Sequence, residues 1–238
     1  MIYKIESRQN QKIKHLVKLS QPKISKELKL FKIEGFHALE MAKESGVLVS
    51  IFTTEEIKNL DVPQYLVSKD IMESISSAKS PQGVICVCKY LEEKPVKSGK
   101  VLLLDNVSDP GNLGTILRTA LAFGYNDVIL RGGCSQYNEK VLQSTQGAIF
   151  RLNILNDFDI KQLKDYEIIA TEIKGSVDLS TISRIGKHVL VLGNEAHGVS
   201  EEILKIANKR VRIDIENIES LNVAVAGAIA MYELKNNS

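Results

Sequence analysis

The chain has 238 residues, of which 44% are hydrophobic and 25% charged, and these ordinary values predict a globular protein with one large domain or two small ones. No apolar run is long enough to span a bilayer and the N-terminus lacks an apolar signal region, so we expect a cytoplasmic protein. Three cysteines without a CxxC pair indicate reduced thiols, and four histidines without metal-ligand spacing disfavour a zinc site.

The positive charge is concentrated at the N-terminus. The whole chain has a net charge of only +2, but residues 1–32 hold nine basic and two acidic residues, a net charge of +7 that leaves −5 for the rest. Such an asymmetry suggests a surface that faces nucleic acid, although a solvated helix face would give the same pattern. Few aromatic residues accompany the charge, which favours phosphate contact over base stacking. The candidates for this contact are Arg8, Lys12, Lys14 and Lys18.

Residues 1–93 predict a small α/β domain. An amphipathic pattern over 10–19, with Ile13, Leu16 and Val17 facing inward, predicts its first helix. Further helices are expected at 36–44 and 69–76, and strands at 31–35, 47–52, 65–67 and 83–90. Polar residues with a proline and a glycine at 94–99 predict a linker to a second domain at 100–238.

Strand and helix signals alternate throughout the second domain. The expected strands are 101–105, 127–131, 151–155, 166–172, 188–193 and 211–215. The expected helices are 112–123, 138–147, 158–164, 200–208 and 221–234. Regular alternation of this kind predicts a mostly parallel sheet with helices on both faces.

A polar helix face follows the first of these strands. The apolar run at 101–104 leads into a turn rich in Asp, Asn, Pro and Gly, after which we expect Asn112 to cap a helix. Asn112, Thr115 and Arg118 lie opposite the apolar stripe of that helix. Open α/β sheets bind ligands beyond the carboxyl ends of their strands, so this polar face is a candidate site. A capped helix with an exposed arginine would explain the motif equally well.

Two later stretches have a similar character. The apolar strand 188–192 runs into an acidic turn bounded by Gly193 and Gly198. Ser220 is expected to cap a final helix that is rich enough in alanine and glycine to be buried on all sides. Neither half has a GxGxxG loop after its first strand, and the turn at 193–198 lacks the phosphate-binding lysine of a P-loop. These absences argue against dinucleotide and nucleoside triphosphate sites.

The three stretches together resemble the SpoU (TrmH-like) family of S-adenosylmethionine-dependent RNA ribose 2′-O-methyltransferases, within the SPOUT superfamily. The resemblance covers most of residues 100–234, and its motifs lie in order at 109–120, 193–198 and 220–223, with a similar segment at 144–148. Residues 1–93 resemble, more loosely, the family's N-terminal substrate-binding domain, which is related to ribosomal proteins. The matches there lie at 7–14, 34–35 and 82–83.

The resemblance implies an α/β domain with a parallel sheet and a deep trefoil knot, a homodimer with composite active sites, and S-adenosylmethionine as cofactor without a metal. It implies methyl transfer to a ribose 2′-hydroxyl of structured RNA, with 23S ribosomal RNA of the large subunit favoured. Transfer RNA is an alternative substrate, and a non-catalytic RNA-binding or ribosome-assembly factor on the same fold is an alternative function. The basic N-terminus disfavours a small-molecule methyltransferase.

By the same resemblance, the active-site residues are Arg118, Asn112, Glu195, Ser220 and Asn222, and the cofactor contacts are Thr171, Leu192, Gly193, Ile213, Ile215 and Leu221. Gly193 would let the backbone approach the cofactor closely, and the three apolar side chains after position 212 would form an adenine slot. Arg118 corresponds to the family's proposed base, with Glu195 and Asn112 orienting it. Because a guanidinium keeps its proton up to a pKa of about 12 or more, stabilising the developing alkoxide or clamping a phosphate is an equally reasonable role.

Two segments depart from the family pattern. Family members usually carry Ile-Pro-Met where this chain has Ile213, Asp214 and Ile215, and the loop that follows is one residue shorter, which bears on the adenine contacts. Residues 135–138 lack the frequent Asp and Pro of the family, which bears on the choice of RNA.

Overall fold

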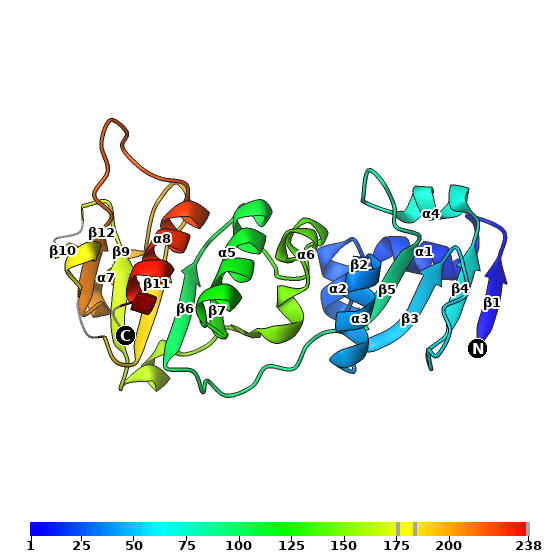
Figure 1. The fold of residues 1–238 in the computed structure, drawn as a ribbon, viewed down its shortest axis with the longest axis horizontal. Helices are drawn as coiled ribbons and strands as arrows, with labels where there is room; N and C mark the ends of the chain where they lie inside the picture. Colours follow the sequence, from blue (N-terminus) through cyan, green and yellow to red (C-terminus); the bar gives the residue numbers. More distant parts are fainter. Residues whose placement is uncertain (175–176, 183–184, 237–238) are drawn as a thin grey trace. The chain divides into compact units, whose positions relative to one another are not determined.

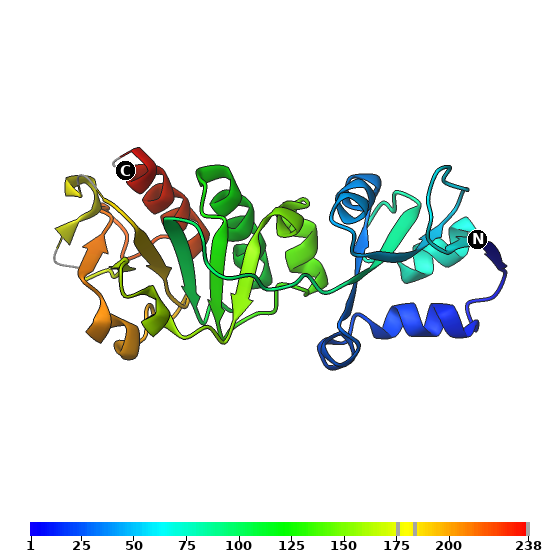
Figure 2. The same cartoon turned by 90° about the horizontal axis from the view of Figure 1, so that it is seen from below.

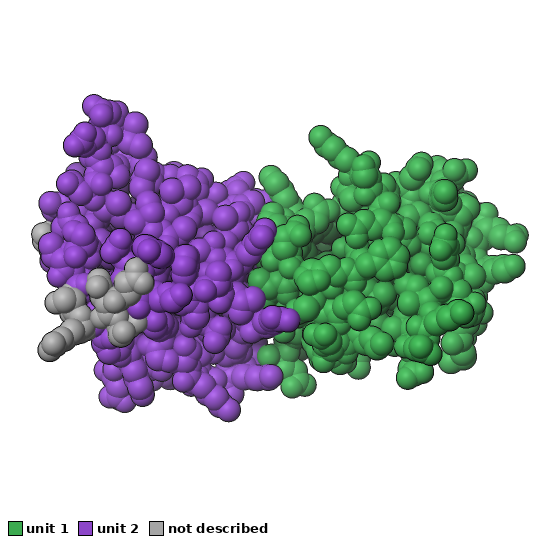
Figure 3. Space-filling model, in the orientation of Figure 1, with its two compact units in different colours: residues 1–92, 137–150 green, residues 93–136, 151–238 purple. Residues whose placement is uncertain are grey.

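The structure is a computed structural model, and it describes residues 1–174, 177–182 and 185–236. The chain forms two compact units, one of residues 1–92 with 137–150 and the other of residues 93–136 with 151–238 (Figure 3). Residues 137–150 thus pack with the first unit, although they follow the polar connection in sequence. No helix within the described ranges is both long and apolar enough to cross a membrane.

The first unit is built on a mixed sheet with the strand order β1-β4-β3-β5-β2. Its strands are β1 (Ile2–Ile5), β2 (Leu30–Glu34), β3 (Leu48–Thr53), β4 (Gln64–Val67) and β5 (Val84–Lys89). Strand β4 pairs in parallel with β1 and β3, whereas β5 pairs antiparallel with β2 and β3. The four-residue edge strand β1 is too short to give a clear alternating pattern, and the sequence did not predict it.

The helices of the first unit are α1 (Gln11–Lys18), α2 (Pro22–Leu28), α3 (Phe36–Glu44), α4 (Lys69–Ile75) and α6 (Glu139–Thr145), followed by the 3-10 turn η1 (Ala148–Arg151) at the unit's edge. Ile13 and Leu16 are buried as the periodicity of α1 predicts, but the inward placement of Val17 was wrong, since it is 46% exposed. Helix α2 was also not predicted, because Ser25 is the one residue in it that is buried and no apolar stripe marks it.

Within the described ranges, the second unit contains a seven-stranded sheet with the order β10-β12-β9-β11-β6-β7-β8 (Figure 1). Its strands are β6 (Lys100–Asp105), β7 (Asp127–Arg131), β8 (Asn153–Asn156), β9 (Glu167–Thr171), β10 (Val177–Asp178), β11 (His188–Leu192) and β12 (Lys209–Arg212). All the pairings in this sheet are parallel, which confirms the sheet predicted from the alternation of elements.

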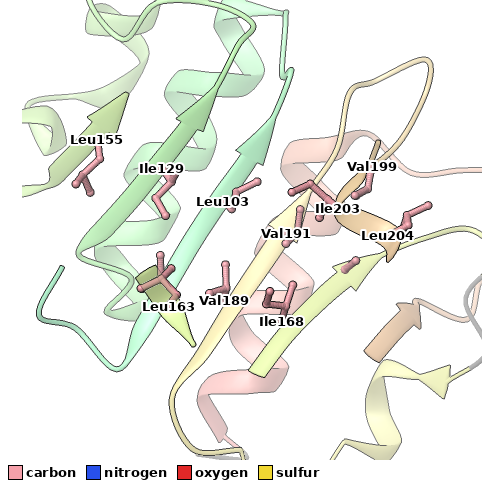
Figure 4. Close-up of a cluster of buried hydrophobic side chains, with 12 residues drawn as sticks. Leu103, Ile129, Leu155, Leu163, Ile168, Val189, Val191, Val199, Ile203 and Leu204 are labelled. Atoms are coloured by element: carbon pink, nitrogen blue, oxygen red, sulfur yellow. The ribbon is translucent and has the colours of Figure 1, made fainter. Parts of the chain in front are cut away.

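Helices cover both faces of the parallel sheet. Helices α5 (Pro110–Phe123) and α8 (Val223–Asn236) pack together on one face, and α7 (Glu201–Ile206) lies on the other face (Figure 2). The unit also contains two short 3-10 turns, η2 (Ile160–Leu163) and η3 (Leu179–Thr181). The central strands are buried on both sides, so their sequences are apolar throughout. On the α7 face, Leu103, Val189 and Val191 pack against Ile203 and Leu204 (Figure 4).

Three of the element boundaries that differ from the sequence prediction lie next to the candidate site. Strand β12 ends at Arg212, not at 215, because its pairing with β9 ends at Val211 and its pairing with β10 ends at Arg212. The N-cap of α5 is Asp109, whose carboxylate accepts a 2.8 Å hydrogen bond from the Asn112 N–H, with Pro110 at the first helical position. Helix α8 is capped by Asn222, not by Ser220: the Asn222 side-chain oxygen accepts from the Ala224 N–H at 2.9 Å.

Candidate functional site

Strands β6 and β11 are neighbours at the centre of the parallel sheet, and the chain leaves their carboxyl ends in opposite directions. From β6 it continues through α5 to β7, and from β11 through α7 to β12 on the other side. A reversal of this kind opens a crevice at the ends of the two strands, which is where open α/β sheets bind ligands. The motifs at 109–120 and 193–198 therefore meet at the topological switch point of the sheet.

The carboxylate of Glu195 joins the two loops that follow these strands. One oxygen accepts hydrogen bonds from the Ser108 N–H at 3.1 Å and the Ser108 hydroxyl at 2.9 Å. The other accepts from the Asp109 N–H at 3.0 Å and from the Asn112 Nδ2 at 3.1 Å. The N-terminus of α5 is therefore held by a negative charge, an arrangement that its helix dipole favours.

This bonding sets the charge state of Glu195. Partial burial alone would raise the pKa of the carboxyl, but the hydrogen bonds from Asn112 and from the backbone N–H groups of Asp109 and Ser108 outweigh it. They lower the pKa from 4.5 to about 2. At neutral pH, Glu195 is thus a fixed carboxylate with too little basicity to remove a proton from a hydroxyl.

Asn112 and Asn222 continue the network toward α8. Asn222 donates from Nδ2 to the Asn112 Oδ1 at 2.9 Å, while its own oxygen caps the helix. Asn112 can then present only its amide N–H to Glu195, because a flipped amide would place an oxygen against the carboxylate. Three of the expected active-site residues, which lie up to 110 positions apart in sequence, are thus brought into one connected chain of hydrogen bonds.

Sequence reasoning missed the side chains that support this chain of hydrogen bonds, above all Ser108, Asp109 and Asn194. Asn194 donates to the Asn106 carbonyl at 2.9 Å and accepts from the N–H groups of Ala196 and His197. It therefore closes its own turn and attaches it to the loop after β6. An asparagine beside a glycine in a strand-to-helix turn is a signal for such local bonds, and it could have indicated Asn194.

A second polar network braces the same loops from the α7 side. The buried Asp105 carboxylate accepts from the Ser200 N–H at 2.7 Å, and Arg131 donates to the Ser200 hydroxyl at 3.0 Å. Arg131 also pairs with Asp105 at 3.4 Å and with Glu202. The ends of β6 and β7 and the start of α7 are thereby fixed together beneath the Glu195 loop.

Gly193 has a structural role that the sequence did not reveal. A Cβ at this position would collide with the Gly198 carbonyl group and the Val199 nitrogen. Asn194 and Gly198 close the loop by exchanging two backbone hydrogen bonds of 2.9 Å, which brings the two ends of the loop this close. A bulky residue at 193 would rearrange the loop itself, so loss of a ligand in such a variant would not by itself place Gly193 against the ligand.

The segment 213–221 forms an open, irregular side of the unit. Ile213, Ile215 and Leu221 are half-buried, and Ser220 is exposed. Among the described residues, no backbone hydrogen bond involves the N–H or C=O groups from 213 to 221. Of the other expected cofactor contacts, Leu192 is fully buried at the end of β11. Thr171 ends β9, where its hydroxyl donates to the Val191 carbonyl at 2.9 Å.

Arg118 stands apart from the Glu195 network. It lies six residues after Asn112 on α5, about 9 Å further along the helix axis, and its side chain is exposed. No hydrogen bond or ion pair joins its guanidinium to any other part of the chain that the structure describes. Within one chain, therefore, Glu195 and Asn112 do not hold Arg118.

Helix α8 packs closely on β11 but is not covered on every side. A Cβ at Gly227 would lie 2.5 Å from the Leu192 Cδ1, so the glycine permits the close approach that the composition predicted. The prediction of burial on all sides was wrong for the single chain, because Val225 is 49% and Tyr232 53% exposed. The outer face of α8 is thus an apolar surface.

The basic residues of the first unit fall into two groups. Arg8, Lys12, Lys14 and Lys18 are exposed on and before α1, and Arg8 donates to the Asp70 carbonyl at 3.0 Å. Lys32, counted in the N-terminal charge, is instead buried: it bonds the Ile75 carbonyl at 3.1 Å and pairs with Glu139 of α6 at 3.1 Å. It fixes α6 to the sheet and is not available to a ligand in solution.

Comparison with known proteins identifies both parts of the chain. Residues 99–232 match the model of the SpoU rRNA Methylase family, and residues 10–86 match that of the MRM3-like substrate binding domain. Within the described ranges, no group of three or more His, Cys, Asp or Glu residues could hold a metal ion.

Several relatives span nearly the whole chain. A 23S rRNA (guanosine(2553)-2′-O)-methyltransferase, RlmP, of Bacillus subtilis is 34% identical over 97% of this chain and 98% of its own length. An uncharacterized tRNA/rRNA methyltransferase of Synechocystis is 30% identical over 98% and 94%. The structure of an AdoMet-bound rRNA methyltransferase from Sinorhizobium meliloti superposes with a TM-score of 0.90 at 27% identity, covering 99% of this chain and 98% of that one. The chain therefore belongs to the SpoU rRNA methylase family.

Proposed function

We propose that the protein transfers a methyl group from S-adenosylmethionine to a ribose 2′-hydroxyl of large-subunit ribosomal RNA. The observation that carries this proposal is the chain of hydrogen bonds from Asn222 through Asn112 to Glu195 at the switch point of the sheet. Family membership supports the reaction. The name of the Bacillus subtilis relative supports 23S ribosomal RNA as the substrate.

The open segment 213–221 fits the adenosine part of the cofactor. Its half-buried Ile213, Ile215 and Leu221 provide apolar surface, and its uncommitted backbone groups provide the donors and acceptors that an adenine edge needs. Thr171 and Leu192, at the ends of two adjacent strands, would border the same site, and the Gly193 backbone would flank it. The solved relative from Sinorhizobium meliloti, described as AdoMet-bound, has the same fold.

S-adenosylmethionine, when bound, supplies a methyl group already activated by its sulfonium. The protein must then align the ribose hydroxyl and stabilise or remove its proton. Glu195, with its pKa of about 2, serves as an anchor that fixes Asn112 and the start of α5. Arg118 is the group we assign to the hydroxyl, either as the base or as a cation that stabilises the developing alkoxide. Ser220 lies exposed beside Asn222 and would contact the substrate.

The position of Arg118 favours a homodimer with composite sites. Its guanidinium is exposed and lies outside the Glu195 network of its own chain. The exposed Val225 and Tyr232 offer an apolar face that a second copy would cover. On this proposal the dimer brings Arg118 of one protomer to the network of the other. The deep trefoil knot stays a prediction from the family resemblance.

The first unit is proposed to bind the RNA substrate. It matches a substrate-binding family, and its exposed cations Arg8, Lys12, Lys14 and Lys18 can contact phosphates. With ribosomal RNA as its substrate, the enzyme would work in the cytoplasm.

The test is methylation of ribosomal RNA isolated from a strain that lacks the protein. The purified chain with S-adenosylmethionine should methylate one nucleotide of the 23S RNA, as mapped by mass spectrometry of nuclease fragments. Methylation of transfer RNA alone would overturn the assignment to ribosomal RNA. Binding of RNA without calorimetric binding of S-adenosylmethionine would instead favour a non-catalytic RNA-binding or assembly factor.

A further inference from the structure

A pocket of about 230 Å³ lies within the first unit, between the start of α3, the connection 76–83 and helix α6. It gathers three segments that the active site does not use, namely Glu34 with Gly35, Gln82 with its neighbour Gly83, and Gln146 with Gly147. Its other lining residues come from the same elements and include His37, Ala78, Ser80 and Gln143.

The walls of the pocket are held in place by hydrogen bonds. The Glu34 carboxylate accepts from the Ser77 N–H at 2.6 Å and the Ser77 hydroxyl at 2.8 Å, and it also bonds the Ser76 hydroxyl. Gln143 of α6 donates to the same Ser77 hydroxyl at 2.8 Å. Strand β2, the connection 76–83 and α6 are thereby joined into a preformed site.

Three glutamine side chains each keep one end of the amide uncommitted. Gln82 uses its oxygen to accept from the Phe36 N–H at 3.2 Å. Gln143 and Gln146 use their Nε2 groups, toward the Ser77 hydroxyl and the Gln143 carbonyl. Among the described residues, the opposite ends of these amides have no partner, which leaves one NH₂ donor and two oxygen acceptors at the pocket.

One aromatic ring lines the pocket, and a second belongs to the residue that precedes it in sequence. His37 lines the pocket, and Phe36, which precedes it at the start of α3, is 51% exposed. The His37 ring lies over Gly147, where a Cβ would be 3.2 Å from the His37 Nε2. Gly147 has a φ of +86°, a conformation that glycine adopts without strain.

The chemistry of the lining selects one class of ligand. None of the described lining residues is a lysine or arginine, and Glu34 adds a negative charge, so a phosphate is disfavoured. Amide donors and acceptors beside aromatic rings are the groups that read and stack unpaired RNA bases. We propose that this pocket takes one unpaired nucleobase of the RNA substrate; the inference rests on the proposed function and adds a recognition site to it.

Binding of single-stranded homopolymers to the full-length chain tests the pocket without knowledge of the target nucleotide. Twelve-residue oligomers of A, C and U should bind with unequal Kd values, because a pocket with one donor and two acceptors discriminates between bases. Gln82→Glu keeps the oxygen that Phe36 uses but replaces the free donor with an acceptor. This variant should bring the three Kd values within about twofold of one another. Gln162→Glu, an exposed glutamine of η2 in the second unit, is the control for the added charge.

A second pair of variants tests the stacking contact. His37→Ala should weaken binding of the preferred oligomer about tenfold, as loss of a base–aromatic stack does, and His37→Phe should restore most of it. All variants should show the circular dichroism spectrum and the denaturant unfolding curve of the wild type, which shows that the first unit is folded. Equal base preference in Gln82→Glu and wild type, together with unchanged binding by His37→Ala, would overturn the pocket assignment.

The outcomes separate this proposal from the function on which it rests. A wild-type chain that methylates 23S RNA but shows no base preference leaves the function intact and removes the pocket. A chain that methylates no RNA but loses its base preference in Gln82→Glu removes the methyltransferase assignment and keeps the nucleobase site.

Discussion

The two sides of the candidate active site differ in how fully their polar groups are used within the chain. On one side, the loops 106–112 and 193–198 are tied together by Glu195, Asn194 and Asn112. On the other, the segment 213–221 has half-buried apolar side chains and no backbone hydrogen bond among the described residues. The first side is preorganised before any ligand arrives, whereas the second has capacity left for one.

This difference indicates a division of labour. A methyl transfer requires accurate alignment of the reacting groups, and fixed loops provide it at no cost when the substrate binds. An open segment can instead form its hydrogen bonds with the cofactor. Within one chain, Arg118 is bonded to neither side of the site. Its contribution therefore depends on the second protomer that we propose to cover the exposed face of α8.

The largest effect is expected for Arg118. Arg118→Ala should reduce turnover on 23S RNA by about 10²- to 10³-fold, as loss of one preorganised charge in an active site does, while calorimetric binding of S-adenosylmethionine stays unchanged. Arg118→Lys should lose nearly as much, because a lysine lacks the planar guanidinium fork. If lysine restores most of the turnover, the residue supplies only long-range charge.

The pH profile of the Arg118→Ala variant distinguishes the two catalytic roles. If Arg118 is the base, the turnover of the variant should rise with pH, because hydroxide can then remove the ribose proton. If it stabilises the alkoxide, the profile should stay flat. Turnover of Arg118→Ala near that of the wild type would remove the residue from the site.

Breaking the preorganised side should cost stability as well as activity. Glu195→Gln replaces one carboxylate oxygen with an NH₂ group that faces donors, either at Ser108 or at Asp109 and Asn112. The free energy of unfolding should fall by about 1–3 kcal/mol, measured by denaturant titration, because the displaced donors lose their partner. Ser74→Ala, at an exposed position of α4 outside this network, is the control.

The same carboxylate should contribute to the dependence of stability on pH. Its pKa is about 2 in the folded chain against 4.5 without its partners, so its contribution is fully present above about pH 4.5 and is lost as the pH falls toward 2. The stability difference between wild type and Glu195→Gln should therefore shrink over this interval. A difference that stays constant with pH would show that the carboxylate is not ionised in the way that its contacts require.

A smaller effect is expected on the open side. Leu221→Ala should weaken binding of S-adenosylmethionine about tenfold, the loss expected when a partly buried leucine no longer covers a ligand. Ile206→Ala, at a more exposed apolar position of α7, should leave the affinity unchanged. Cofactor binding should also slow amide hydrogen exchange in 213–221 far more than in 106–112. Equal protection of both segments would remove the distinction between the two sides.

The basic residues of the first unit also differ in whether they are bonded within the chain or exposed. The effect on RNA affinity per side chain is expected to be smallest here. Replacing Lys12, Lys14 and Lys18 with Gln should lower the slope of log affinity for RNA against log salt by about 2–3. Lys32→Gln should leave the slope unchanged and reduce stability, because Lys32 is bonded to Ile75 and Glu139. A slope that is unaltered by the triple substitution would leave those lysines as a solvated helix face.

The sequence alone determined the features that depend on neighbours along the chain. Apolar runs and periodicity located most strands and helices of the parallel domain, because a strand buried on both faces must be apolar throughout. The order and spacing of the three motifs were sufficient to indicate the family. The cap of α5 was misplaced by three residues, since Asp109 and Asn112 are both good capping residues and only the backbone path decides between them.

The tertiary structure decided which polar groups meet. The bond from Asn222 to Asn112 spans 110 positions, and the role of Gly193 arises from the closing of its own loop against Gly198. Residues 137–150 pack with the first unit, and Lys32 of that unit is buried. The residues next to them in sequence predicted neither of these two placements. Local patterns record what a residue prefers, but hydrogen bonds across strands and helices depend on distances that only the folded chain fixes.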